Sequence, residues 1–164
     1  MSWLEELALK IRARATNVFI LQTLDFDRIT QLIKAIPTAL FHYKDEYGQA
    51  HGRTPTIWDI NTNKLYRKET PYQRETELSI TEAANIMQDL KTWLIRHAGT
   101  FMIIHYVWSE SQAQSLTPQL ISISQDPNVY GSNSLIAVFT ASEYLFPETL
   151  LKFCHVINIP ISTD

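Results

Sequence analysis

Residues 100–108 read Thr-Phe-Met-Ile-Ile-His-Tyr-Val-Trp, an almost unbroken apolar run that is rich in β-branched and aromatic side chains. Such a run is typical of a strand that is buried on both faces, as the strands of parallel sheets are. Similar runs occupy residues 17–22 and 134–140. Because helical patterns separate these runs along the chain, we expect a mainly parallel sheet with helices on both faces.

Helical signals occupy the segments between these strands. Residues 2–5 (Ser-Trp-Leu-Glu) and 79–82 (Ser-Ile-Thr-Glu) are capping boxes, and each precedes apolar side chains at helical spacing. They predict helices that end near Ala15 and His97. A further helix is expected to begin at Asp25 or Asp27 and to end at Pro37. Two more are predicted after Ser109 or Ser111 and at about residues 147–153.

Two more strands, at residues 38–43 and 155–161, bring the expected sheet to five. The least regular segment is an insert at about residues 44–78, in which residues 56–60 and 64–67 flank Asn61-Thr62-Asn63. Asparagine tolerates positive φ, so a hairpin is predicted there, with both strands or only one of them paired with the main sheet. The predicted fold is a three-layer α/β sandwich in a single domain, residues 1–164.

The chain has 164 residues but only four glycines, and none precedes Gly48. Neither a G-x-G-x-x-G nor a G-x-x-x-x-G-K-[ST] pattern can therefore be written, which excludes a standard dinucleotide fingerprint and a working phosphate loop. The net charge of −3 lacks the basic footprint of a nucleic-acid-binding protein. A basic cluster, Lys64, Arg67, Lys68 and Arg74, lies among glutamates, so we interpret it as a solvated mixed-charge face.

The N-terminus carries two acids within six residues and no secretion signal. The longest apolar runs fall far short of the roughly 20 residues that span a bilayer. We therefore expect a protein that is cytoplasmic, or stromal if it is encoded in a plastid, and that is not bound to a membrane.

In open α/β sheets, ligands bind beyond the carboxyl ends of the strands. After the first strand come Leu24 and Phe26, which fill the space of a phosphate, and two aspartates, which repel it. No lysine is present in that turn, so nucleotide binding is not expected. Glu110 alone does not form a metal site, and Ser142 with Glu143 fits a helix N-terminus.

No catalytic residue, metal or cofactor is predicted. Cys154 lies in an apolar run and is expected to be a buried, inert thiol. The histidines and carboxylates show no metal-ligand spacing. The alternative hypothesis is a small α/β enzyme with an unrecognised site near residues 47–60, around His51, Trp58 and Asp59.

Aromatic side chains with polar tips are enriched at protein interfaces. We expect such side chains to gather near the strand ends and the insert. They define a candidate interaction surface, whose predicted members are Trp58, Tyr66, Tyr106, Trp108 and His51.

Two segments resemble a family of AAA-type ATPases of archaea, cyanobacteria and chloroplasts, which carry a degenerate ATPase-like domain ahead of a functional AAA module. The segments are residues 7–22, beginning Leu-Ala-Leu-Lys-Ile-Arg-Ala-Arg, and residues 135–160, which resemble a sensor strand, a proline-initiated helix and a last strand. The resemblance implies a P-loop-like sheet of strand order 5-1-4-3-2.

The same resemblance implies a pseudo-ATPase that acts in regulation, oligomerisation or protein interaction rather than catalysis. Such a chain would be either an excised N-terminal domain or a free-standing protein. Its partner would be a protein or a second copy of itself. A stand-alone adaptor in a multiprotein complex is the third hypothesis.

Overall fold

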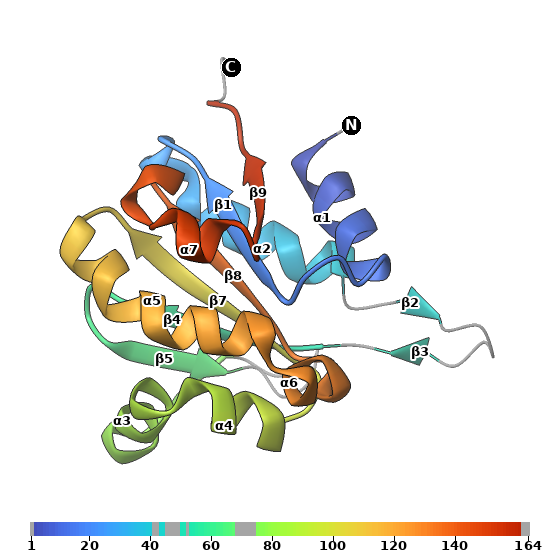
Figure 1. The fold of residues 1–164 in the computed structure, drawn as a ribbon, viewed down its shortest axis with the longest axis vertical. Helices are drawn as coiled ribbons and strands as arrows, with labels where there is room; N and C mark the ends of the chain where they lie inside the picture. Colours follow the sequence, from blue (N-terminus) through green and yellow to red (C-terminus); the bar gives the residue numbers. More distant parts are fainter. Residues whose placement is uncertain (1, 41–42, 45–49, 52, 68–74, 162–164) are drawn as a thin grey trace.

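The computed structural model describes residues 2–40, 43–44, 50–51, 53–67 and 75–161. The fold is α/β, with helices covering a mixed sheet of seven strands, of which five neighbouring strands run parallel (Figure 1). Across the sheet the strands are β6 (Thr76–Glu77), β5 (Lys64–Arg67), β4 (Thr54–Asp59), β7 (Thr100–Val107), β8 (Leu135–Thr140), β1 (Val18–Gln22) and β9 (His155–Asn158).

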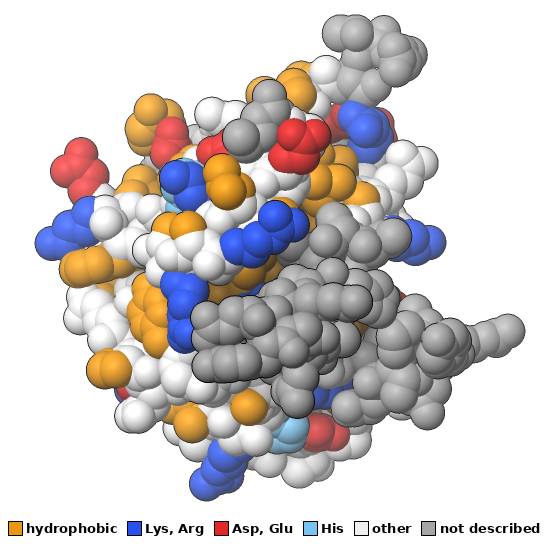
Figure 2. Space-filling view, turned by 90° about the vertical axis from the view of Figure 1, so that its right-hand side faces the viewer, with side chains coloured by type: hydrophobic (Ala, Val, Ile, Leu, Met, Phe, Trp, Pro, Cys, Tyr) orange, Lys and Arg blue, Asp and Glu red, His pale blue; other side chains and the backbone are white. Residues whose placement is uncertain are grey.

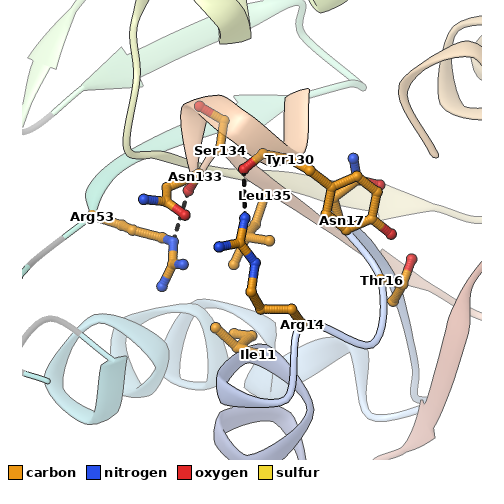
Figure 3. Close-up of a pocket in the computed structure, with 9 residues that line it drawn as sticks. All are labelled: Ile11, Arg14, Thr16, Asn17, Arg53, Tyr130, Asn133, Ser134 and Leu135. Atoms are coloured by element: carbon orange, nitrogen blue, oxygen red, sulfur yellow. Dashed lines mark hydrogen bonds between the residues drawn. The ribbon is translucent and has the colours of Figure 1, made fainter. Parts of the chain in front are cut away.

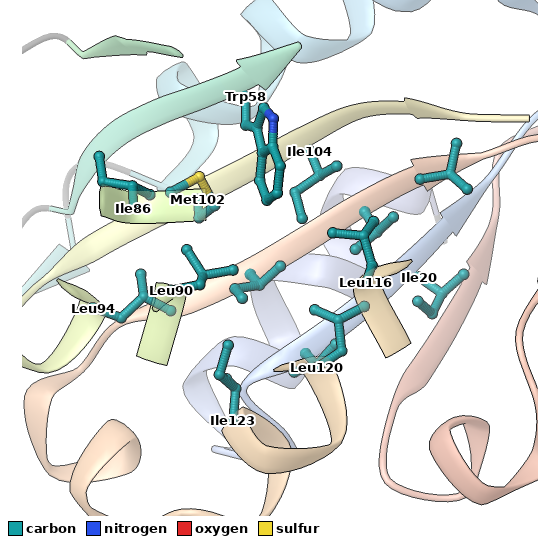
Figure 4. Close-up of a cluster of buried hydrophobic side chains, with 14 of the residues drawn as sticks. Ile20, Trp58, Ile86, Leu90, Leu94, Met102, Ile104, Leu116, Leu120 and Ile123 are labelled. Carbon is teal, nitrogen blue, oxygen red and sulfur yellow. The ribbon is translucent and has the colours of Figure 1, made fainter. Parts of the chain in front are cut away.

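Each face of the sheet buries its own apolar cluster. On one face α1 (Trp3–Arg12) and α2 (Ile29–Leu40) pack against side chains such as Phe19 and Phe139. The opposite cluster, shown in Figure 4, includes Ile20 and Met102. The helices over that face are α3 (Ile80–Gln88), α4 (Leu90–Arg96), α5 (Glu110–Gln125), α6 (Pro127–Ser132) and α7 (Glu148–Leu151). Every side chain of β8 is buried, as expected of a strand in the centre of a covered parallel sheet.

The predicted strand at residues 38–43 is wrong. Helix α2 does not end at Pro37 but continues to Leu40, because a proline removes one backbone donor without always ending the helix. Tyr43–Lys44 (β2) pairs only with Ala50–His51 (β3), in a separate two-stranded sheet. The predicted five-stranded, mainly parallel sheet is likewise corrected to a mixed sheet of seven strands.

Strand β4 lies beside β7, at the edge of the parallel strands. Residues 38–43 were expected at that position. It pairs in parallel with β7 on one side and antiparallel with β5 on the other. The hairpin around Asn61-Thr62-Asn63 is therefore confirmed, and Asn63 has the positive φ of 55° that such a turn requires. Both of its strands belong to the main sheet.

Arg67 corrects the interpretation of its region as a solvated charged face. Its side chain is 8% exposed and donates hydrogen bonds to Thr56 Oγ1 at 2.9 Å and Thr100 Oγ1 at 3.0 Å. Its guanidinium carbon lies 5.1 Å from the centroid of the Trp93 ring, within the range of a cation–π contact. Arg67 thus ties β5 to β4, β7 and α4.

The single helix predicted to end near His97 is two helices that meet at Asp89. The backbone of Asp89 is not helical (φ −143°, ψ 75°), and its carboxylate accepts hydrogen bonds from the backbone N and Oγ1 of Thr92 in the first turn of the next helix. Gln119 of α5 accepts a hydrogen bond from the Leu90 backbone N–H at the same point. Helix α4 can therefore follow the sheet at a different angle from α3.

We expect Asp89→Ala to lower the free energy of unfolding by about 1 kcal/mol, the usual loss on removal of an N-cap. Asp89→Asn, which keeps a capping oxygen, is the matched control and should lose less.

Hydrogen bonds from Thr92 hold the pKa of Asp89 below its ordinary value. The carboxylate therefore stabilises the fold at neutral pH, and this contribution disappears as the pH falls below about 4. Urea denaturation of the three proteins at pH 7 and pH 3 measures both effects; equal stability at pH 7 would contradict this role.

Candidate interaction surface

The parallel strands end along one side of the sheet, which we call the carboxyl edge: residues 23–28 after β1, 60–63 after β4, 108–110 after β7 and 141–147 after β8. Four of the eight large apolar side chains that are exposed in the described part of the chain lie here: Leu24 (71% exposed), Phe26 (58%), Trp108 (61%) and Tyr144 (83%). Exposed aromatic side chains gathered on one part of a surface indicate a site of contact with another molecule.

Hydrogen bonds hold the exposed Trp108 in position. The backbone N–H of Trp108 donates to Gln112 Oε1 at 3.0 Å, and the indole Nε1 donates to Asn61 Oδ1 at 2.9 Å. Gln112 Nε2 donates to the same oxygen of Asn61 at 2.8 Å. The indole is therefore fixed between the β4–β5 turn and α5, so little conformational entropy remains to be lost when a partner binds.

The turn after β1 is fixed to β7 in a similar way. Tyr106 is 4% exposed, and its hydroxyl donates to the backbone oxygen of Thr23 at 2.8 Å, while burial raises its pKa. The exposed ring of Phe26 lies over it, with 5.4 Å between the ring centroids. Asp25 pairs with Arg28 at 3.3 Å. Where a phosphate loop would need small residues and a lysine, this turn presents Leu24 and Phe26.

Gln22 organises the end of β8 and the Tyr144 segment. Its Oε1 accepts a hydrogen bond from the Glu143 backbone N–H at 2.6 Å, and its Nε2 donates to Asn158 Oδ1 at 2.7 Å. The hydroxyl of Ser142 caps the next short helix by accepting from Tyr144 N at 3.2 Å, which confirms the capping role predicted for Ser142. Tyr144 is thereby presented on an ordered turn.

Acidic side chains surround these apolar ones. Asp27, Glu110 and Glu143 lie on the three loops that follow β1, β7 and β8, and none of them forms an ion pair among the described residues. The same loops contain one cation, Arg28, which is paired with Asp25. The carboxyl edge is therefore an acidic and aromatic surface that suits a basic partner and repels phosphate.

Comparisons with known proteins do not assign this surface. The sequence has no match among protein-family models or curated proteins.

Five side chains are predicted to form an interaction surface, and the structure separates the four of them that it describes. Trp108 lies on the carboxyl edge, whereas Tyr106 is buried beneath Phe26. Trp58 is 5% exposed and points into the apolar cluster of Figure 4, because β4 lies inside the sheet and is covered by α3. Tyr66 is half-buried on β5. The side chain of His51 lies outside the described part of the chain.

The backbone of His51 belongs to β3, which precedes the first residue of β4 (Figure 1). Asp59 is the last residue of β4, and five steps of about 3.3 Å put about 17 Å between the two ends of that strand. The alternative site around His51, Trp58 and Asp59 includes a side chain outside the described part of the chain, so it stays a prediction. Leu24, Phe26 and Tyr144 belong to the surface but were not predicted as members of it. The one sequence feature that could have indicated them is their position just after the end of a strand.

Three side chains in the described part of the chain that could perform chemistry are shifted in pKa by burial or engaged in a contact. Burial raises the pKa of Cys154 to about 12, as expected of an inert thiol, and its Sγ donates to Leu150 O. His155 Nε2 lies 3.0 Å from Glu6 Oε1, and burial lowers the pKa of His105. Across the described ranges, no three His, Cys, Asp or Glu side chains gather as metal ligands. The helices in those ranges are too short or too polar to cross a membrane.

Proposed function

We propose that this chain is a catalytically inactive, ATPase-like α/β module that binds a protein partner through its carboxyl edge. In this proposal it serves an AAA-type ATPase in regulation or assembly. The observation that carries the proposal is the turn after β1, where Leu24 and Phe26 are exposed at the place of a phosphate loop. A binding edge that has lost its phosphate chemistry and gained exposed aromatic side chains suits a protein better than a nucleotide.

The strand order gives further support. The parallel strands β9, β1, β8 and β7 lie side by side in the order implied by the resemblance to AAA-type ATPases, with β4 in the place of the second strand. A stand-alone adaptor would use the same surface, and the identity of the bound partner distinguishes the two functions. An AAA-type ATPase as the partner supports the regulatory module, and any other protein supports the adaptor.

Isothermal calorimetry with a non-hydrolysable ATP analogue and Mg²⁺ tests the nucleotide side of the proposal. We expect no measurable binding and no change in melting temperature, because the turn after β1 has no lysine and carries two acids. Binding with a dissociation constant below about 100 μM would overturn the proposal if Asp25→Ala or Glu110→Ala abolished that binding. Ser122→Ala, a small change on α5 away from the carboxyl edge, is the control variant.

A further inference from the structure

A groove runs along α5 from the carboxyl edge. Its volume is about 390 Å³, and it lies between one face of α5 and the segment that joins β8 to α7. The α5 wall includes Glu110, Gln114 and Pro118, and the facing wall includes Tyr144 and Pro147. The helical rise from Glu110 to Pro118 is about 12 Å, which is the span of about four residues of extended chain.

Pro118 leaves a backbone acceptor without its usual donor on the α5 wall. It lies in the interior of α5, far from the first turn in which a proline is normally tolerated. Because a proline has no N–H, the carbonyl of Gln114, four residues earlier, lacks the donor that an α-helix supplies. The hydroxyl of Thr117 does not take this place, since it donates to Ala113 O at 2.7 Å. The Gln114 carbonyl can therefore accept from a donor that enters the groove.

The rest of the groove favours a cationic donor. None of the residues that line it is a lysine, an arginine or a histidine. Such basic side chains are instead spread over the side of the molecule that bears α1 (Figure 2). Glu110 forms no ion pair within the described part of the chain. An acid in a first helical turn is common and would not by itself mark a site, but Glu110 shares this groove with the Gln114 carbonyl and the exposed ring of Tyr144.

Arginine already satisfies helix carbonyls elsewhere in this fold. At a small pocket near the amino ends of the parallel strands, Arg14 Nη2 donates to Tyr130 O and Arg53 Nε donates to Asn133 O, both at 2.8 Å (Figure 3). Both carbonyls lie at the C-terminal end of α6, where intrahelical donors run out. The groove beside α5 presents a carbonyl of the same kind with no arginine among its lining residues.

We propose that this groove binds an arginine side chain of the partner protein, carried on an extended segment. The proposal rests on the proposed function, since it names the chemistry that the carboxyl edge recognises. A guanidinium group has five N–H donors in one plane. It can donate to the Glu110 carboxylate and the Gln114 carbonyl while its flat face stacks on the Tyr144 ring. Its apolar stem then packs against Leu145 and Pro147.

This chemistry predicts a preference for arginine over two similar side chains. Lysine carries the same charge, but its donors sit on one atom and it has no planar face to stack on Tyr144. Citrulline keeps the planar shape but has no charge for Glu110. A peptide with arginine should therefore bind at least about fivefold more tightly than the same peptide with lysine or citrulline.

An NMR titration of the full chain tests the proposal. The probes are the capped tripeptide acetyl-Gly-Arg-Gly-amide and its lysine and citrulline counterparts. We expect the arginine peptide to bind with a dissociation constant of about 5 mM or tighter. It should shift the backbone amide signals of residues 110–117 and 143–146, which border the groove.

Three variants separate these contacts from folding. Glu110→Gln keeps the shape of the side chain and should weaken binding of the arginine peptide at least about fivefold. Pro118→Ala returns an N–H to the Gln114 carbonyl, so it should weaken binding about threefold while the melting temperature stays or rises. Glu5→Gln makes the same change in net charge on α1 and should bind as the wild type does.

Equal affinity for the three peptides, shifts confined to other residues, or unchanged binding by either groove variant would overturn the proposal. If no arginine peptide binds but a protein is still captured at the carboxyl edge, the proposed function stands and the arginine site alone is wrong.

Discussion

Phe139→Ala is expected to lower the free energy of unfolding by about 3–5 kcal/mol, the largest single effect that the fold predicts. Phe139 is fully buried in β8, between β1 and β7, and Trp3 of α1 meets its ring edge-on with 6.4 Å between centroids. Removal of the ring leaves a cavity that the neighbouring strands cannot close without breaking their hydrogen bonds. Urea denaturation at pH 7 measures the loss.

Phe153→Ala removes the same ring from a partly exposed position and is the matched control. The Phe153 side chain is 36% exposed, so its truncation should cost less than about 1 kcal/mol. Equal losses for the two variants would show that β8 is not the centre of the core.

Trp108→Ala is expected to reduce partner binding by at least about tenfold without a comparable loss of stability. Interface energy concentrates in a few aromatic and arginine side chains, and Trp108 is 61% exposed in a fixed orientation. The measurement is the yield of covalent adduct from a benzophenone side chain placed at position 144, compared with and without Trp108→Ala. The melting temperature of each protein is measured alongside.

Leu9→Ala is the control for this measurement. Leu9 is 47% exposed on α1, outside the carboxyl edge, so its truncation removes an apolar side chain from a different surface. We expect the adduct yield to stay unchanged. A fall as large as that of Trp108→Ala would show that the contact is non-specific.

The parts of the fold that sequence reasoning predicted are those with a strong local cause. Strands β1, β7 and β8 are buried on both faces, so their sequences are continuous apolar runs. The hydroxyls of Ser2 and Ser79 cap α1 and α3 as their capping boxes predict.

The errors came from positions that tertiary contacts decide. Residues 38–43 resemble a strand locally, but the place beside β7 is taken by β4, and the pairing of β4 with β7 joins segments that lie far apart in sequence. At the helix break, Gln119 of α5 accepts a hydrogen bond from the Leu90 backbone N–H, a contact that no local pattern contains. Long-range pairing of this kind overrides local preference.

The candidate site was predicted only in part, for a similar reason. Trp58 and Tyr106 have polar tips like Trp108. Successive side chains along a strand point to opposite faces of the sheet, and each of these two is buried in one of the two apolar clusters. Leu24 and Phe26 were treated as obstacles to phosphate, since composition does not show which loop side chains remain exposed. Their exposure depends on how Tyr106 and Thr23 fix the turn.

Photo-crosslinking at position 24 in the source cell is the most direct test of the claim that the carboxyl edge binds a protein. With benzophenone at position 24 we predict a discrete protein adduct that excess ATP and Mg²⁺ do not reduce, and no such adduct with benzophenone at position 9, which is exposed on α1 outside the carboxyl edge. Equal labelling from both positions, or loss of the position-24 adduct on addition of ATP and Mg²⁺, would contradict the account.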